Sequence, residues 1–304
     1  MTKKYGKWNE AKFYPNCQTI NSSDQEYCTE KMLYGENAEV KIKYCYNTEE
    51  YNIDAYEHEI LLRIAASHGI TKNQLIKYLK LQGKIFHSGK FESCMEKLEK
   101  YGYIVNIKIA GLDDNGSIIV YDLAERGTEH LKNKELPHYS SLKEYSDGNI
   151  LRLLRVKITS NQILLQLLCN YKDLKSFFFD REFIIPGAGN VLFPLYIQTT
   201  ENNYAFKFVD NTKAGKNRFE EQMEILLKDN STVLDDTILV IVAETYEHLE
   251  RLYTLAMNYK KRGLKREILF TNDSDWYRAL PGNFYGMAVI SVLGQSSMMN
   301  IKLV

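Results

Sequence analysis

The chain has little of what marks secreted and membrane proteins. Its five cysteines show no obvious pairing scheme, which argues against a disulfide framework. Its longest apolar runs, such as residues 238–243, are far too short to cross a bilayer, and the polar residues 1–4 do not open a signal peptide. We therefore expect a cytoplasmic location and no membrane partner.

Motifs of familiar enzymes are missing as well. There is no glycine-rich phosphate loop ending in lysine, no Gly-x-Ser-x-Gly nucleophile turn and no histidine-rich metal motif. Residues 187–189, Gly-Ala-Gly, lack the strand-to-helix context of a dinucleotide-binding turn, so we predict a loop there. From these patterns we expect no cofactor, no metal and no enzymatic activity.

Two successive helices are indicated after residue 53. Asp54 is placed to cap the first, Glu57 completes a capping box three residues later, and apolar residues recur at helical spacing up to Gly69. Thr71 is placed to cap the second helix, and Gly83 is placed to end it. These signals predict a pair of helices joined by a short turn.

A third helix and a β-hairpin follow. The helix begins near Ser88 and carries apolar residues at every third or fourth position. Residues 104–109 and 117–122 have strand composition, and the polar residues 111–116 between them are bounded by glycines, which predicts a hairpin tip. Together with a short helix expected after residues 121–127, this order of elements resembles that of bacterial winged-helix proteins.

The charge of the chain is zero overall but uneven locally. The sequence has 39 basic and 39 acidic residues, yet between residues 69 and 110 eight lysines stand against three glutamates. Such a region attracts phosphates. A winged helix used for protein contacts, with its lysines merely solvated, is the alternative interpretation.

The resemblance to helix-turn-helix docking assigns roles within this basic region. The start of the third helix would meet base edges, and the second helix would brace the DNA backbone. The candidates for base contacts are His87, Ser88, Lys90 and Ser93. The candidates for phosphate contacts are Lys72, Lys77 and Lys84, and the predicted DNA-binding set is completed by Lys97 and Lys108. Tyr101 and Tyr103 are interpreted as core residues.

Residues 1–53 carry a weaker signal. The patterns around Cys17 and Cys28 resemble the two knuckles of a small zinc ribbon, but Tyr14 and Lys31 stand where two of the four ligands would be. Structural zinc uses four Cys or His ligands. We therefore predict a degenerate ribbon without metal, with bound zinc as the alternative.

Beyond a polar, turn-prone linker, the pattern changes to alternating helices and strands. The expected order is a helix capped by Thr159 or Ser160, a hairpin of strands over 191–197 and 204–209, a helix over 217–228, a buried strand over 237–243, a helix over 246–259, a strand over 267–271 and an edge strand over 287–292. A strand, a helix and a strand of these lengths usually form a right-handed parallel crossover, which predicts an α/β sheet.

This order resembles the core of restriction-endonuclease-like domains. A winged helix followed by such a domain resembles the replication-relaxation family of plasmids and integrative elements, a resemblance carried by residues 208–212 before one helix and 239–244 before the next. It implies a role in replication, in transfer through the relaxosome or in their regulation, with double-stranded DNA and replication or relaxosome proteins as partners. Antitoxins that join a winged helix to a C-terminal domain are a second resemblance, which implies a transcriptional regulator.

A nuclease would need more than this fold. It requires a metal-binding carboxylate on one hairpin strand and an acid two residues before a lysine on the next. Residues 205–207 read Ala-Phe-Lys, a lysine without its acid. Asp210, Glu220 and Glu224 lie nearby and are interpreted as a solvated face. We predict a DNA-binding protein without nuclease activity; a metal-dependent nuclease with a rearranged site is the alternative.

These interpretations give a mixed α/β (α+β) chain. Its parts are a degenerate zinc ribbon over 1–53, a winged helix over 54–135, a linker over 136–149 and a non-catalytic, restriction-endonuclease-like α/β domain over 150–304. A length of 304 residues with 44% hydrophobic content suffices for two cores. Because winged-helix proteins read two-fold symmetric sites as pairs, we expect a homodimer held partly by residues after 150.

Overall fold

The computed structural model describes residues 39–43, 45, 47, 49–83, 87–110, 117–132, 147–170, 173–229, 231–272, 276 and 288–289. It is a mixed α/β structure with two sheets, which confirms the predicted fold class at that level. The described residues up to Leu165 belong to one compact unit, the N-terminal unit, and those from Gln166 onward belong to the C-terminal unit. The predicted zinc ribbon around Cys17 and Cys28, the hairpin tip, Lys84 and most of the predicted linker lie outside the described residues.

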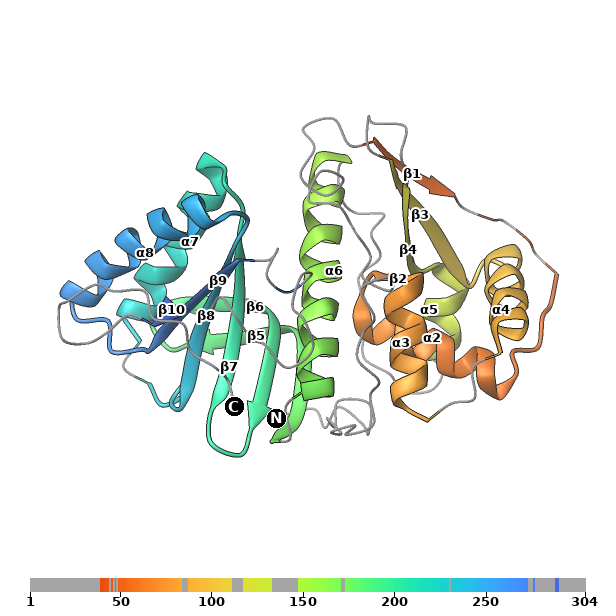
Figure 1. The fold of residues 1–304 in the computed structure, drawn as a ribbon, viewed down its shortest axis with the longest axis horizontal. Helices are drawn as coiled ribbons and strands as arrows, with labels where there is room; N and C mark the ends of the chain where they lie inside the picture. The colour runs from red at the N-terminus through yellow and green to blue at the C-terminus, as the bar shows by residue number, and fades with distance from the viewer. Residues whose placement is uncertain are drawn as a thin grey trace. The chain divides into compact units, whose positions relative to one another are not determined.

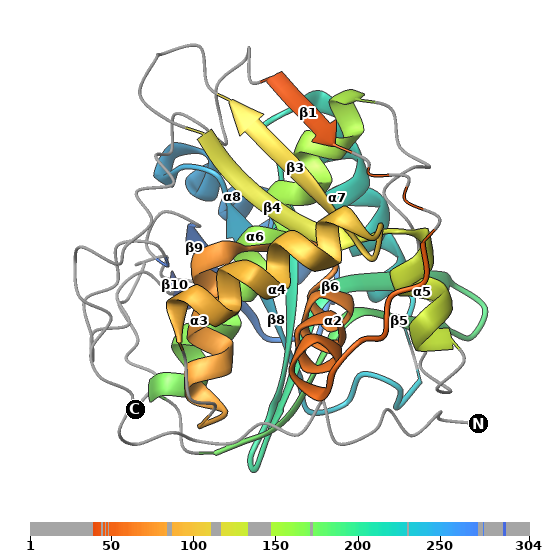
Figure 2. The same ribbon diagram turned by 90° about the vertical axis from the view of Figure 1, so that its right-hand side faces the viewer.

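The N-terminal unit combines an antiparallel four-stranded sheet with helices (Figures 1 and 2). Its elements are β1 (Glu39–Lys43), α2 (Ala55–Ser67), β2 (Ile70–Thr71), α3 (Lys72–Leu81), α4 (Ser88–Lys100), β3 (Ile104–Ala110), β4 (Ser117–Leu123), α5 (Glu125–Lys132) and most of α6 (Asp147–Asn170). The strand order is β1-β3-β4-β2. The three predicted helices and the hairpin strands are confirmed, whereas β1 was not predicted.

Both predicted helix starts are capped as expected. The backbone N–H of Glu57 donates to Asp54 Oδ1 at 2.7 Å, and the N–H of Asp54 donates to Glu57 Oε2 at 3.0 Å. Thr71 and Gln74 form the equivalent reciprocal pair at the start of α3. Each pair satisfies N–H groups that a helix start leaves without partners, so the beginnings of α2 and α3 are fixed by local sequence.

Helix α6 corrects the prediction that Thr159 or Ser160 caps a helix. The helix already begins at Asp147, so both residues lie in its interior, where they are fully buried. The next residue, Asn161, donates from Nδ2 to the carbonyls of Ser67 and Gly69 at 3.3 and 3.2 Å. The residue after the two expected caps therefore makes a buried contact with the turn after α2.

The C-terminal unit is built on a six-stranded mixed sheet in the order β10-β9-β8-β7-β6-β5. Its elements are β5 (Leu174–Ile185), β6 (Gly189–Thr199), β7 (Asn203–Val209), α7 (Lys213–Leu227), β8 (Thr237–Ala243), α8 (Tyr246–Lys261), β9 (Ile268–Asn272) and β10 (Ala288–Val289). Strands β7, β8 and β9 are parallel, as the predicted crossover requires, and the β6–β7 hairpin and the edge strand β10 are antiparallel. Strand β5 was not predicted.

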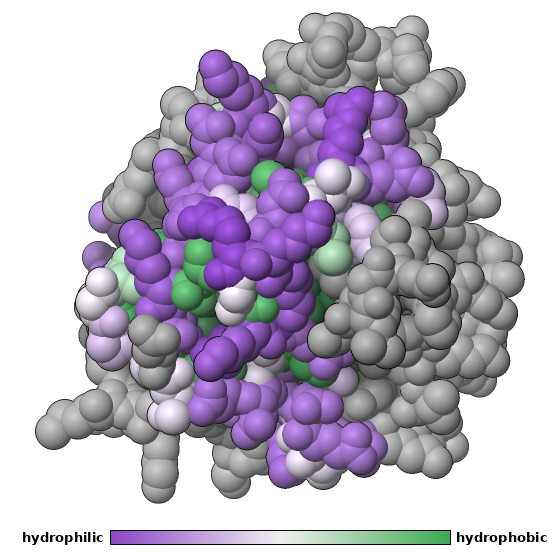
Figure 3. Space-filling view, turned by 90° about the vertical axis from the view of Figure 1, so that its left-hand side faces the viewer, coloured by the Kyte–Doolittle hydropathy of each residue, from purple (hydrophilic) through white to green (hydrophobic). Residues whose placement is uncertain are grey.

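Helices α7 and α8 cover one face of this sheet (Figure 1). Helix α7 begins at Lys213, four residues earlier than predicted, because Thr212 caps it by accepting from the N–H of Gly215 at 2.9 Å. In α8, Leu249 is part of the core, and Tyr253 and Met257 pack against it. The face over these helices is mainly hydrophilic (Figure 3), since their apolar side chains are used against the sheet. No helix among the described residues is long and apolar enough to cross a membrane.

Asp122 gives the N-terminal unit a predicted dependence on pH. This β4 residue is fully buried; burial raises its pKa to about 7, although a hydrogen bond from the N–H of Leu123 and attraction to Lys157 oppose the shift. The folded-state pKa thus lies above the ordinary value of 3.8. The folded protein binds this proton more tightly, so the free energy of unfolding should fall as the pH rises from about 4 to about 7, by at most about 4 kcal/mol.

We expect Asp122→Asn to remove this fall, because an amide has no proton to lose and still accepts from Leu123. Urea unfolding at about pH 5 and about pH 8 measures the free energy of unfolding of both proteins. The variant should be more stable than the wild type at the higher pH. An identical pH dependence in both proteins would contradict the assignment.

Candidate functional site

Helix α4 has one buried and one exposed face. Phe91, Met95 and Leu98 are at most 4% exposed and anchor the helix in the N-terminal unit. The predicted residues His87, at the N-cap, and Ser88, Lys90, Ser93 and Lys97 are all exposed. Because residues three and four apart lie on the same side of a helix, Lys90, Ser93 and Lys97 form one stripe. Ser88 comes two residues before Lys90 and therefore lies on another side of the first turn.

The electrostatics of α4 favour an anion along this stripe. The side chain of the N-cap residue His87 makes no cap hydrogen bond and the first turn of α4 contains no acidic residue, so nothing within α4 neutralises the positive end of the helix dipole. The last turn carries Lys97 and Lys100. Glu96 is exposed on the same side and reduces the charge.

Lys72 and Lys90, two of the predicted lysines, contact side chains of neighbouring helices. Lys72, at the start of α3, forms an ion pair with Glu92 of α4, and both side chains remain well exposed. Lys90 Nζ lies 4.8 Å from the ring centroid of Tyr56. An exposed ion pair contributes about 0–1 kcal/mol, so a phosphate can compete with Glu92 for Lys72 at small cost.

The remaining predicted residues lie apart from this stripe. Lys77 is half-buried on α3, and Lys108 is exposed on β3. Lys41 and Lys43, which are exposed on β1 next to β3, were not among the predicted residues. The alternation of the Glu-Val-Lys-Ile-Lys segment at residues 39–43 is the signal that would have indicated them.

Of the two tyrosines that follow α4, Tyr103 is a core residue as predicted, whereas Tyr101 is only half-buried. Tyr103 is buried, with 7% of its surface exposed, and its hydroxyl donates to the carbonyl of Tyr51 at 3.1 Å. Tyr101 stacks on the ring of Tyr51, with ring centroids 4.4 Å apart. They therefore pack the segment that precedes α2.

Arg126 of α5 holds the same segment in place. Its guanidinium donates to the carbonyls of Asn47 at 2.7 Å, Glu49 at 3.0 Å and Tyr101 at 3.0 Å. Three bonds from one planar cation fix the backbone between β1 and α2. Strand β1 is thereby kept close to its pairing partner β3.

The carboxylates considered for a nuclease are each engaged by a basic side chain. Asp210 Oδ2 lies 2.6 Å from Arg218, and both oxygens of Glu224 accept from Arg262. Glu220 lies 4.0 Å from Lys216. Across the described part of the chain, no group of three His, Cys, Asp or Glu side chains is placed to hold a metal ion.

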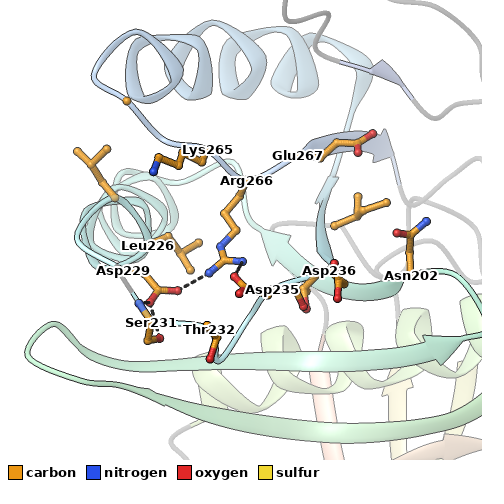
Figure 4. A pocket seen from close by; sticks show the side chains of 14 residues that line it. Asn202, Leu226, Asp229, Ser231, Thr232, Asp235, Asp236, Lys265, Arg266 and Glu267 are labelled. Atoms are coloured by element: carbon orange, nitrogen blue, oxygen red, sulfur yellow. Dashed lines mark hydrogen bonds and ion pairs between the residues drawn. The ribbon is translucent and has the colours of Figure 1, made fainter.

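A polar hollow of about 650 Å³ lies at the amino ends of β8 and β9 (Figure 4). At its centre Arg266 bonds Asp229 Oδ2 at 2.6 Å and reaches Asp235 Oδ1 at 3.5 Å. Burial disfavours the Asp229 carboxylate, but hydrogen bonds from Ser231 and Arg266 outweigh this and lower its pKa. The arginine is thus neutralised by its own neighbours, and the network joins the loop after α7 to the loop before β9.

No protein-family model matches this chain, and no curated protein matches it either.

We expect DNA to remain intact when the full chain is incubated with Mg²⁺ or Mn²⁺. Asp210, Glu220 and Glu224 each lie beside a basic residue, and no three metal-ligating side chains among the described residues are grouped to place a metal beside a scissile phosphate near Lys207 on β7. Supercoiled, linear and single-stranded DNA are the substrates, with Lys207→Ala as the matched variant. Metal-dependent cleavage by the wild type that is lost in Lys207→Ala would show that a nuclease site exists.

Proposed function

We propose that the N-terminal unit is a winged helix that binds double-stranded DNA, with α4 as the helix that enters the major groove and α3 as the helix that braces the backbone. The observation that carries the proposal is the exposed stripe of Lys90, Ser93 and Lys97, which lies opposite the buried stripe of α4. A helix anchored by one face and cationic on the other suits contact with a polyanion.

The order of elements supports the same proposal. Helices α2, α3 and α4 are followed by the hairpin β3–β4, and the short strand β2 between α2 and α3 pairs with β4. Within this arrangement His87 and Ser88 stand at the start of α4, where base edges are met in helix-turn-helix docking. Lys77 and Lys97 are then the candidates for phosphate contacts.

The process that this DNA binding serves follows from the resemblance to the replication-relaxation family. We propose replication, transfer through a relaxosome or the regulation of either, on a bacterial plasmid or mobile element. The C-terminal unit would act through its surfaces, in a homodimer or toward a replication or relaxosome protein, and not as a nuclease.

The test is a salt titration of duplex DNA binding by the full chain. Each phosphate contact that is lost should flatten the slope of log K against log salt by about 0.9. We expect this for Lys97→Gln and Lys77→Gln with any sequence, whereas Lys90→Gln should also relax sequence preference once a site is known. Glu92→Gln should bind more tightly than the wild type, because it releases Lys72.

Lys175→Gln is the matched control, since it removes an exposed lysine from β5 in the C-terminal unit. Its binding should equal that of the wild type. The proposal fails if the wild type does not bind duplex DNA, or if Lys97→Gln and Lys175→Gln have the same effect.

A further inference from the structure

The sheet of the N-terminal unit has a cationic face that its own helices leave partly open. In β1 and β3 the pairing register places Lys41 opposite Lys108 and Lys43 opposite Asn106. Paired residues of an antiparallel ladder point to the same side, so these four residues share one face, here called the β1–β3 face. The alternate residues Ile107 and Ile109 of β3 are fully buried on the other side.

The pairing of Lys41 with Lys108 is unfavourable in isolation. Directly opposite residues in an antiparallel pair have Cβ atoms about 5 Å apart, and like charges there repel. Both side chains are exposed, so water screens the repulsion without removing it. Two lysine side chains that leave the sheet at directly paired positions place positive charge side by side, which a polyanion would neutralise.

The β1–β3 face continues from the stripe of α4. Glu99, in the last turn of α4, accepts from Lys43 Nζ at 2.5 Å and from Asn106 Nδ2 at 3.4 Å. The end of α4 therefore lies over one end of the face. Lys41 and Lys108 come two residues farther along their strands, where β1, β3 and β4 extend past the helix (Figure 2).

We propose that Lys41 and Lys108 form a second phosphate-binding row, which grips the DNA backbone beyond the groove that α4 occupies. The proposal rests on the proposed function, and it adds the outer strand β1 to the interface. The occupant is the sugar-phosphate backbone of the same duplex, because only a continuous polyanion would meet the α4 stripe and the β1–β3 face together.

The test uses two variants of the full chain, one that removes the charges of Lys41 and Lys108 and one that reverses the charge of Lys41. A labelled duplex of mixed sequence is the probe, titrated with salt. The double variant Lys41→Gln/Lys108→Gln should flatten the slope of log K against log salt by about 1.8, two contacts of about 0.9 each. Lys41→Glu reverses the charge at that position and should also weaken binding. Its melting temperature should equal or exceed that of the wild type, because the glutamate faces Lys108 across the ladder.

The outcomes separate this proposal from the one on which it rests. If the wild type binds and Lys97→Gln weakens binding, but both Lys41 variants bind like the wild type, the β1–β3 face makes no contact and only this inference is overturned. If the wild type does not bind duplex DNA, both are overturned. A lower melting temperature for Lys41→Glu would show that the expected pair with Lys108 does not form, which contradicts the placement of the two side chains on one face.

Discussion

The burial of one stripe of α4 is the constraint on which the rest of the interface depends. Phe91, Met95 and Leu98 are almost completely buried, and burying a side chain of this kind is worth about 1.5–3 kcal/mol. An exposed ion pair such as Lys72–Glu92 contributes about 0–1 kcal/mol. Burial of the apolar stripe therefore sets the orientation of α4 about its axis. That orientation exposes the lysines on the opposite face, and their own interactions are not needed to maintain it.

Two polar contacts fix the elements around α4. The amide of Asn161 donates to the carbonyls of Ser67 and Gly69, which holds the turn that leads from α2 through β2 into α3. Arg126 donates to three carbonyls and holds the segment between β1 and α2. The first contact positions the helix pair, and the second keeps β1 beside β3, while Glu99 joins the end of α4 to the β1–β3 face.

Local signals predicted the elements that local chemistry determines. The capping boxes at Asp54 and Thr71 need only residues three apart; the first was predicted in full, and at the second the Thr71 cap was predicted but not the return bond from Gln74. The fully buried strand β8 was equally clear, because seven consecutive apolar or β-branched residues leave no exposed face.

What the sequence did not predict depends on contacts between distant residues. Strand β1 has five residues and needs β3 as its partner, and β5 pairs with β6 on both sides of Asp180, whose φ is 49°. Thr159 and Ser160 were predicted to start a helix because their side chains are of the type that caps helices, whereas both lie inside α6. The Lys72–Glu92 pair likewise joins two helices, so it was invisible to a count of charges along the chain.

Lysine acetylation of the full chain, with and without duplex DNA, is the most direct test of whether the α4 stripe and the β1–β3 face bind DNA. Mass spectrometry of the modified protein reports the accessibility of each amine. The account predicts that duplex DNA protects Lys97, Lys108 and Lys41, and leaves Lys175 and Lys228 of the C-terminal unit as reactive as before. Protection concentrated in the C-terminal unit, or equal reactivity at every lysine under conditions in which DNA is bound, would contradict it.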